Sequence, residues 1–346
     1  MQKDEKRVRV IVDAMGGDNA PVEIIKGSVL AAKELNVDIT LVGKEDVIRP
    51  ILEKEGAGIE FEIVNATQEV FMEDNPSSVL REKKDTSMGV ALRLLGEKKG
   101  DAVVSAGSTG ALLTGGTLFV KRIRGIRRAA LAPVIPTKNG GALLIDCGAN
   151  VECTSEYLLQ FAYMGYFYAK RQMGIENPRV GLINIGAEET KGTPLYRETY
   201  ALLKKAGDNG LLNFVGNIEG RDIVEGGADV ILSDGFTGNV VLKTIEGVGL
   251  FFAGEMKKIF KRSFYTKLAA LMVKPGLTGF RKMLDYRETG GAPLLGIAKP
   301  VIKAHGSSDA YSFKSAIKQA VVYAESGIIR DIENNIGAMT LNSSEN

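Results

Sequence analysis

The sequence of 346 residues has no tryptophan, one histidine (His305) and two cysteines, Cys147 and Cys153. A single histidine cannot supply the several imidazoles of a histidine-built zinc site. Two cysteines close together in sequence provide neither a zinc ribbon nor a disulfide framework, and they favour a reducing compartment. We therefore expect no metal site and a cytoplasmic location.

Long apolar runs and a strong charge imbalance are also absent. No segment offers the about 18 consecutive apolar residues that a membrane-spanning helix needs. The N-terminal MQKDEKRVRV lacks the apolar centre of a signal peptide. The formal net charge is only +2, so the whole-molecule charge argues against nucleic acid as a partner. At most, the protein is expected to lie on a membrane surface.

Common catalytic motifs are missing as well. The sequence has no P-loop, and Gly16-Gly17-Asp18 stands where a dinucleotide fingerprint would follow the first predicted strand. There is no G-x-S-x-G nucleophile motif. Cys147 and His305 could form a nucleophile and base, but a buried cysteine that packs as a small hydrophobic residue is the better interpretation. These absences disfavour NAD, ATP and covalent enzymes.

Glycine, in contrast, is abundant, with 41 residues against 10 prolines. Short runs that are apolar on both faces alternate with helical patterns. The predicted strands cover residues 8–14, 39–42, 59–64, 102–106, 130–135, 142–145, 180–185, 212–215 and 230–232. This alternation predicts an α/β fold, a three-layer α/β/α sandwich with a mostly parallel sheet. We expect a single α/β domain over residues 1–346.

Five predicted strands are followed by loops that combine glycine with Ser, Thr or Asn. In open α/β sheets, ligands bind outside the carboxyl ends of the strands, beside helix N-termini that favour anions. The alternative to an anion site is a turn with a Ser or Thr helix cap, which the same residues would also form. For His305 the alternative is a capping or structural role. The candidate phosphate or oxyanion ligands are Gly107, Ser108, Thr109, Gly110, Gly235, Thr237, Gly238, His305, Gly306, Ser307 and Ser308. A further loop, 186–192, contains Lys191, and another, 148–150, follows residues 142–147.

Six motifs, in this order along the chain, resemble the phosphate acyltransferase family, PlsX. They are VDAMGGDNAP (12–21), SAGSTGAL (105–112), IDCGANV (145–151), GLINIGAEETKG (181–192), DGFTGNVVLKTIEG (234–247) and KAHGSSD (303–309). The resemblance implies a fold related to isopropylmalate dehydrogenase and phosphotransacetylase, a homodimer, and no cofactor. Two positions depart from the family pattern: Asn19 stands in place of a histidine, and Ser108 in place of an asparagine.

The implied reaction transfers a long-chain fatty acyl group from acyl carrier protein to inorganic phosphate. A membrane glycerol-phosphate acyltransferase would then use the acyl phosphate for phospholipid synthesis. Phosphate is itself a nucleophile, so the protein has to position it and stabilise an oxyanion. Under this hypothesis Lys191 neutralises charge, and Asn239 donates a hydrogen bond together with backbone amides of the glycine loops.

Residues 257–284 contain eight basic and no acidic residues, with apolar residues at helical spacing. We expect a basic amphipathic helical arm at about 250–285, interrupted at Pro275-Gly276. It suits an anionic membrane surface, a docking surface for the acidic carrier protein, or a dimer-interface helix pair. The predicted contact residues are Lys257, Phe260, Lys261, Phe264, Leu268, Leu271 and Met272. A second basic cluster, at 121–128, suits carrier docking or a solvated loop equally.

Three other functions remain open. A phosphotransacetylase-like enzyme would use coenzyme A thioesters with the same chemistry. A metal- and NAD-dependent dehydrogenase of the same fold would need clustered aspartates, and no predicted helix presents such a set. A non-catalytic lipid- or carrier-binding protein would not need Lys191, Asn239 and five loops suited to anions.

Overall fold

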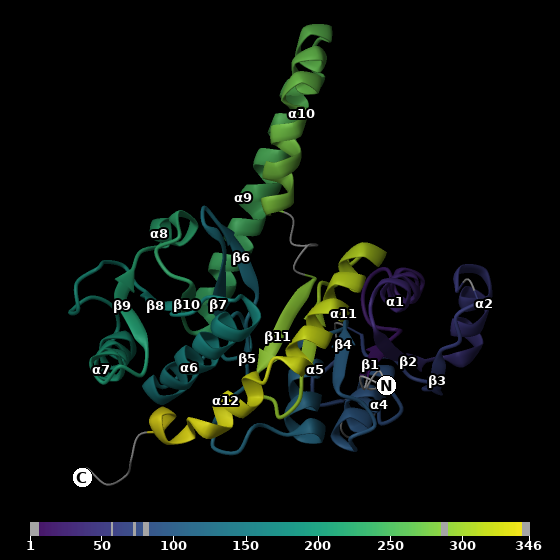
Figure 1. Ribbon diagram of the computed structural model, residues 1–346, viewed down its shortest axis with the longest axis horizontal. Coiled ribbons are helices and arrows are strands. Elements are labelled where there is room, and N and C mark those ends of the chain that lie inside the picture. Colours follow the sequence, from purple (N-terminus) through teal and green to yellow (C-terminus); the bar gives the residue numbers. More distant parts are fainter. Residues whose placement is uncertain (1–6, 57, 72–73, 79–82, 285–289, 341–346) are drawn as a thin grey trace, which may run out of the picture.

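The computed structural model describes residues 7–56, 58–71, 74–78, 83–284 and 290–340, with the backbone alone at 275 and 277–284. Figure 1 shows a body built from two groups of strands and a pair of long helices that projects away from it. The fold class predicted from the alternating pattern is confirmed, although the strands form two sheets. The expectation of a single domain remains a prediction.

The first sheet has seven strands in the order β3-β2-β1-β4-β12-β11-β5. Its strands are β1 (Val8–Asp13), β2 (Val37–Gly43), β3 (Glu62–Asn65), β4 (Ala102–Ser105), β5 (Ala130–Leu131), β11 (Gly291–Leu295) and β12 (Val301–Ala304). All neighbours are parallel except β11, which runs antiparallel to β12 and β5. In the register of the first pair, Val8 lies opposite Val37. The carboxyl ends of β1, β4 and β12 therefore share one edge.

The second sheet has five strands in the order β6-β7-β10-β8-β9. Its strands are β6 (Val134–Thr137), β7 (Gly140–Ile145), β8 (Arg179–Ile183), β9 (Asn213–Ile218) and β10 (Val230–Leu232). Only β6 is antiparallel to its neighbour. The single strand predicted over residues 130–135 is wrong. The chain crosses from the first sheet to the second at Ala132-Pro133, where proline provides no N–H for a continuous ladder.

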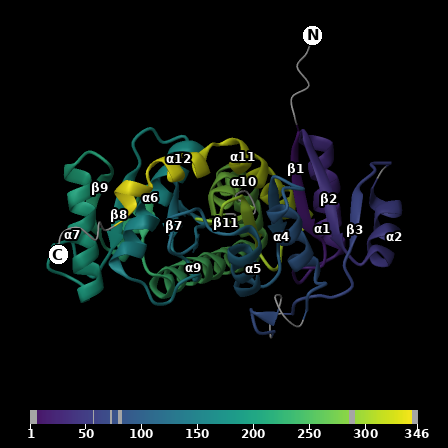
Figure 2. The same cartoon turned by 90° about the horizontal axis from the view of Figure 1, so that it is seen from below.

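Helices cover both sheets, as buried parallel strands require. They are α1 (Val22–Glu34), α2 (Glu45–Glu55), α4 (Ser87–Gly96), α5 (Thr109–Gly115), α6 (Ser155–Gln172), α7 (Pro194–Asp208), α8 (Gly220–Glu225), α11 (Ala310–Glu325) and α12 (Ile328–Asn334), with the short helices η1 (Gly116–Val120) and η2 (Ile336–Met339). The paired helices α1 and α11 contact the first sheet, as does α4, and α6 contacts the second. Figure 2 shows the two strand groups side by side.

The projecting pair consists of α9 (Gly235–Lys261) and α10 (Phe264–Leu284). The turn between them is fixed by reciprocal bonds between Ser263 and Thr266, where each amide donates to the other hydroxyl. The interruption predicted at Pro275 is wrong, because α10 continues through it. A proline removes one hydrogen bond and bends a helix without having to end it. Within the described residues, no helix has both the length and the apolarity needed to cross a membrane.

Candidate active site

Three loops meet at the carboxyl edge of the first sheet because β1, β4 and β12 are parallel neighbours. The loops after β1 and β4 approach closely: a Cβ atom on Gly16 would lie 2.7 Å from the amide nitrogen of Gly107. The loops after β1 and β12 are joined by the Asp18 amide, which donates to the Gly306 carbonyl at 2.8 Å. The structure thus brings the predicted phosphate loops at Gly107 and Gly306 to one place.

Asn19 stands where the family resemblance leads us to expect a histidine. Its side-chain amide donates to the carbonyls of Ser307, at 3.1 Å, and Ser308, at 3.2 Å. A histidine in one tautomer has a single ring N–H and would not make both bonds from one atom. Asn19 therefore holds the loop after β1 against the loop after β12, and this structural task explains its side chain without assigning it proton transfer.

A buried polar network lies beneath these loops. The Ser105 hydroxyl donates to Asp13 at 2.6 Å, and the Gly107 amide donates to the Ser105 hydroxyl oxygen at 3.1 Å. Burial raises the pKa of Asp13, against the opposing hydrogen bonds from Ser105 and Ser87. Because Asp13 ends β1 and Ser105 ends β4, this network fixes the start of both loops. Asp13 was not predicted from the sequence as part of the site.

Lys303 is a second residue without a predicted role, although it lies in the motif KAHGSSD (303–309). Its ammonium lies under the loops and donates to the carbonyls of Ala106, at 3.1 Å, and Ala304. Burial lowers the pKa of Lys303 to about 8, because the charged form loses hydration. Burial likewise lowers the pKa of His305, whose Nδ1 lies 2.9 Å from the Ser307 hydroxyl. The edge of the first sheet thus holds a half-buried positive charge.

The second sheet presents a corresponding set of loops after β7 and β10. The N-terminus of α9 packs directly on the loop after β7: a Cβ atom on Gly238 would lie 1.9 Å from the Asp146 carbonyl oxygen. The Gly235 amide donates to the Asn150 carbonyl at 2.8 Å. Asp146 is buried and accepts from the amides of Leu131, at 2.8 Å, and Asn150, at 2.6 Å. Burial raises the pKa of Asp146 despite these hydrogen bonds.

Asp234 caps α9 and accepts hydrogen bonds from Thr237, which we predicted to bind phosphate. Its carboxylate accepts from the Thr237 amide at 2.8 Å and from the Thr237 hydroxyl at 2.9 Å. The Tyr196 hydroxyl on α7 donates to it at 2.6 Å. Both donors of Thr237 are therefore used in the capping of α9 by Asp234. The hydroxyl of Ser308 similarly donates to the His305 carbonyl within its own turn, at 2.7 Å.

The helix α9 lies between the two groups of loops. The charges of its residues Lys243 and Glu246 act on His305, after β12, and on Cys147, after β7. The Lys243 charge also acts on Lys303. The part of α9 around Lys243 and Glu246 therefore lies within electrostatic reach of His305 after β12 and of Cys147 after β7.

Lys191 and Asn239, the predicted catalytic pair, are both exposed. Asn239 lies in the first turns of α9, where its side-chain Cγ is 3.6 Å from the position of a Cβ on Gly148. Lys191 lies in the loop after β8, whose backbone is fixed by a bond from the Asn184 side chain to the Lys191 carbonyl at 3.2 Å. Because β8 and β10 are neighbours, the Lys191 loop and the start of α9 share one edge of the second sheet.

The remaining candidates are Ser108, with the amides that follow it, and Cys147. Ser108 is the residue before α5, and its buried side chain makes no capping bond there, which leaves the following amides of Thr109 and Gly110 at a helix N-terminus. Cys147 is buried, and its thiol donates to the Gly238 carbonyl at 3.3 Å. Burial raises the pKa of the Cys147 thiol far above its ordinary range. The interpretation of Cys147 as a packing residue is confirmed.

The arm exposes large apolar side chains beside its basic ones. Phe264 is 76% exposed and Met272 is 79% exposed, and Phe260 is half-buried. Leu268 and Leu271 are exposed, as are Lys257 and Lys261. The other predicted basic and apolar residues at 277–283 lie outside the side chains that the structure describes. Apolar side chains at this density on one element are unusual for a surface without a partner.

The chain is similar in sequence to proteins of known name. Residues 8–331 match the family described as fatty acid synthesis protein. A phosphate acyltransferase of Thermoanaerobacter pseudethanolicus is 46% identical over 333 residues, which cover 96% of this chain and 98% of the relative. One of Heliobacterium modesticaldum is 48% identical over 331 residues, which cover 95% and 98%. The chain belongs to the phosphate acyltransferase family, PlsX. It is accordingly an acyltransferase, as the six motifs implied.

Solved structures share the fold of this phosphate acyltransferase. A phosphotransacetylase of Streptococcus pyogenes gives a TM-score of 0.65 at 16% identity, over 95% of each chain. The EutD phosphotransacetylase of Staphylococcus aureus gives 0.60 at 14% identity, over 92% of this chain and 94% of the other. At these identities the likeness concerns the fold alone, and it confirms the phosphotransacetylase-like sandwich that the resemblance implied.

Proposed function

We propose that this chain transfers a long-chain fatty acyl group from acyl carrier protein to inorganic phosphate, and that the acyl phosphate supplies phospholipid synthesis through a membrane glycerol-phosphate acyltransferase. The observation that carries the proposal is the pair of glycine-loop clusters in a member of the phosphate acyltransferase family: the loops after β1, β4 and β12 meet at one edge, and the loop after β7 packs on the start of α9. Such loops suit a small tetrahedral anion.

The mechanism follows from what the site contains. Phosphate oxygen attacks the thioester carbonyl carbon, a tetrahedral oxyanion forms, and the carbon–sulfur bond breaks to release the carrier thiolate and acyl phosphate. Cys147 is unsuited to a covalent intermediate because its thiol is buried and its pKa is raised. Direct attack leaves the protein the tasks of positioning phosphate and stabilising the oxyanion. We assign charge neutralisation to Lys191 and hydrogen-bond donation to Asn239 and the amides after Ser108.

The test is acyl phosphate formation by the purified protein from long-chain acyl carrier protein and phosphate, without added nucleotide. Acyl coenzyme A is run in parallel. Faster turnover of the carrier thioester is the expected result. Preference for acyl coenzyme A would favour a phosphotransacetylase-like enzyme, and no turnover with either thioester would favour a non-catalytic binding protein.

We further propose that the arm attaches the enzyme to anionic membranes, so that the apolar product stays close to its consumer. Exposed apolar residues beside lysines are the pattern of helices that lie in a membrane interface. Phe264 and Leu271 are exposed, and both lie on α10, which contains no acidic residue between its ends. We also propose the homodimer that the family resemblance implies. Sedimentation in the absence of vesicles measures its mass independently of membrane binding.

Phe264→Glu should lower the partition coefficient for phosphatidylglycerol vesicles by about 10- to 100-fold. Burial of a phenylalanine side chain contributes about 1.5–3 kcal/mol, and each 1.4 kcal/mol is about tenfold in an equilibrium constant. The control is Ala269→Glu, an exposed position on the same helix that makes the same charge change but removes little apolar surface. Vesicle flotation measures both variants. Equal flotation of wild type and Phe264→Glu would contradict the membrane proposal.

A further inference from the structure

The segment 121–128 is a concentrated basic surface on the body, separate from the arm. Five of its eight residues are basic and none is acidic: Lys121, Arg122, Arg124, Arg127 and Arg128. All but Arg122 are exposed. Five cations within eight residues repel one another, and this repulsion is relieved when an acidic surface binds.

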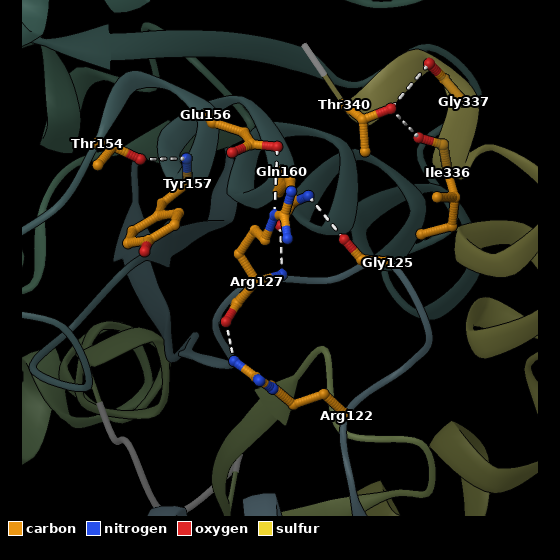
Figure 3. Close-up of polar contacts among 10 residues, drawn as sticks. All are labelled: Arg122, Gly125, Arg127, Thr154, Glu156, Tyr157, Gln160, Ile336, Gly337 and Thr340. Atoms are coloured by element: carbon orange, nitrogen blue, oxygen red, sulfur yellow. Dashed lines mark hydrogen bonds and ion pairs between the residues drawn. The ribbon is translucent and has the colours of Figure 1, made fainter. Parts of the chain in front are cut away.

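The backbone of this basic loop is held in place from beneath. The fully buried side chain of Gln160 on α6 donates to the Gly125 carbonyl at 3.1 Å and accepts from the Arg127 amide at 2.8 Å (Figure 3). Ile123 and Ile126 are buried in the core. The loop therefore presents its cations from a fixed backbone, which reduces the entropy that ordering on binding would cost.

Few of these cations are neutralised within the described part of the chain. Arg127 lies 3.5 Å from Glu156 (Figure 3), and the guanidinium of Arg122 donates to the Arg127 carbonyl. Arg128 stacks over the Tyr157 ring, 5.6 Å from its centroid. Among the described residues, Lys121, Arg124 and Arg128 form no ion pair. Exposed Glu152 lies in the neighbouring loop after β7. The net charge of the loop remains strongly positive.

The basic loop ends beside the candidate active site. Arg128 precedes Ala129, whose carbonyl accepts from the Asn150 side chain at 2.8 Å. The Asn150 carbonyl in turn accepts from the Gly235 amide at the start of α9. The Arg128 charge also acts on Cys153 in the same loop as Asn150. A protein bound at residues 121–128 is thus placed at the rim of the glycine loops.

We infer that the basic loop 121–128 is the docking surface for the acidic face of the acyl carrier protein that delivers the thioester. The inference rests on the proposed function, because it supplies the place where the proposed acyl donor binds. Electrostatic contacts at the rim of a site steer association and register more than they add to the binding of the thioester itself.

The test is the double variant Arg124→Glu/Arg128→Glu, which leaves the Arg127–Glu156 and Arg122–Arg127 contacts in place. The control is Lys33→Glu/Lys54→Glu, with the same change of charge on α1 and α2, at the opposite end of the first sheet (Figure 1). Turnover is measured with acyl carrier protein and with the small thioester acyl pantetheine. We expect an about 10- to 100-fold higher KM for the carrier thioester only in the first variant, with a weaker dependence on salt.

An equal loss with acyl pantetheine, or an unchanged KM for the carrier thioester, would overturn the docking surface. Binding of acyl carrier protein to immobilised enzyme at low salt is measured separately from turnover. If wild type and the control bind the carrier but Arg124→Glu/Arg128→Glu does not, the surface stands even when no thioester is turned over. That result would reject the proposed acyl transfer to phosphate but retain the docking surface. Absence of carrier binding by wild type would overturn the docking surface itself.

Discussion

Gly238→Ala should lower the free energy of unfolding by about 3 kcal/mol or more, or prevent folding. The added Cβ would lie 1.9 Å from the carbonyl oxygen of Asp146 and 2.6 Å from the Ser233 hydroxyl oxygen. Neither can move freely, because Asp146 is buried in a hydrogen-bond network and Ser233 donates to that same carbonyl. The new methyl group must therefore push α9 away from the loop after β7. Urea unfolding followed by circular dichroism measures the effect.

The matched control lies on the same helix. Gly247 has no atom within 4 Å of its hypothetical Cβ, so Gly247→Ala meets no obstacle. Alanine is favoured over glycine inside a helix by about 1 kcal/mol, and we expect Gly247→Ala to stabilise the protein slightly. If Gly238→Ala were as stable as Gly247→Ala, the close approach of α9 to Asp146 would be wrong.

Much of the fold could be predicted from local pattern because its strands are buried on both faces. The runs at 8–14, 102–106 and 230–232 correspond to β1, β4 and β10. The division into two sheets could not be predicted, since periodicity gives the faces of a strand and not its neighbours. The antiparallel strand β11 was missed for a related reason: GAPLL contains a glycine and a proline and resembles a loop.

The sequence identified the loops that meet at the edge of the first sheet. It did not identify the residues beneath these loops that hold them in place. Glycine loops that follow parallel neighbouring strands share one edge of the sheet. For this reason Gly107 and Gly306 were predicted as parts of one phosphate site. Asp13 and Lys303 were missed because an acid or a lysine in a strand-end motif has no periodic signature. Their position beneath the loops arises only when β1, β4 and β12 are neighbours. The pattern around Thr237 did not indicate that Asp234 would accept from both of its donors.

Lys191→Ala and Asn239→Ala should each lower the turnover number by about 100- to 1,000-fold, the usual cost of losing one group that stabilises an oxyanion. Both side chains are exposed, so neither substitution leaves a cavity or a buried partner. The free energy of unfolding should remain within about 0.5 kcal/mol of wild type. Steady-state acyl phosphate formation and urea unfolding measure the two quantities on the same preparations. Lys205→Ala, at an exposed lysine on neighbouring α7, is the control for Lys191 and should keep wild-type turnover.

The double variant decides whether the two residues serve the same transition state. If Lys191 and Asn239 stabilise one oxyanion, their effects on the activation free energy will not add, because the second removal acts on a site already impaired. Lys191→Ala should also raise the KM for phosphate if Lys191 holds that ion before attack, whereas Asn239→Ala should change the turnover number alone. Full additivity would show that the two side chains act independently of each other. Near-normal turnover in folded Lys191→Ala would remove its role and leave half-buried Lys303 as a positive charge beneath the loops of the first sheet.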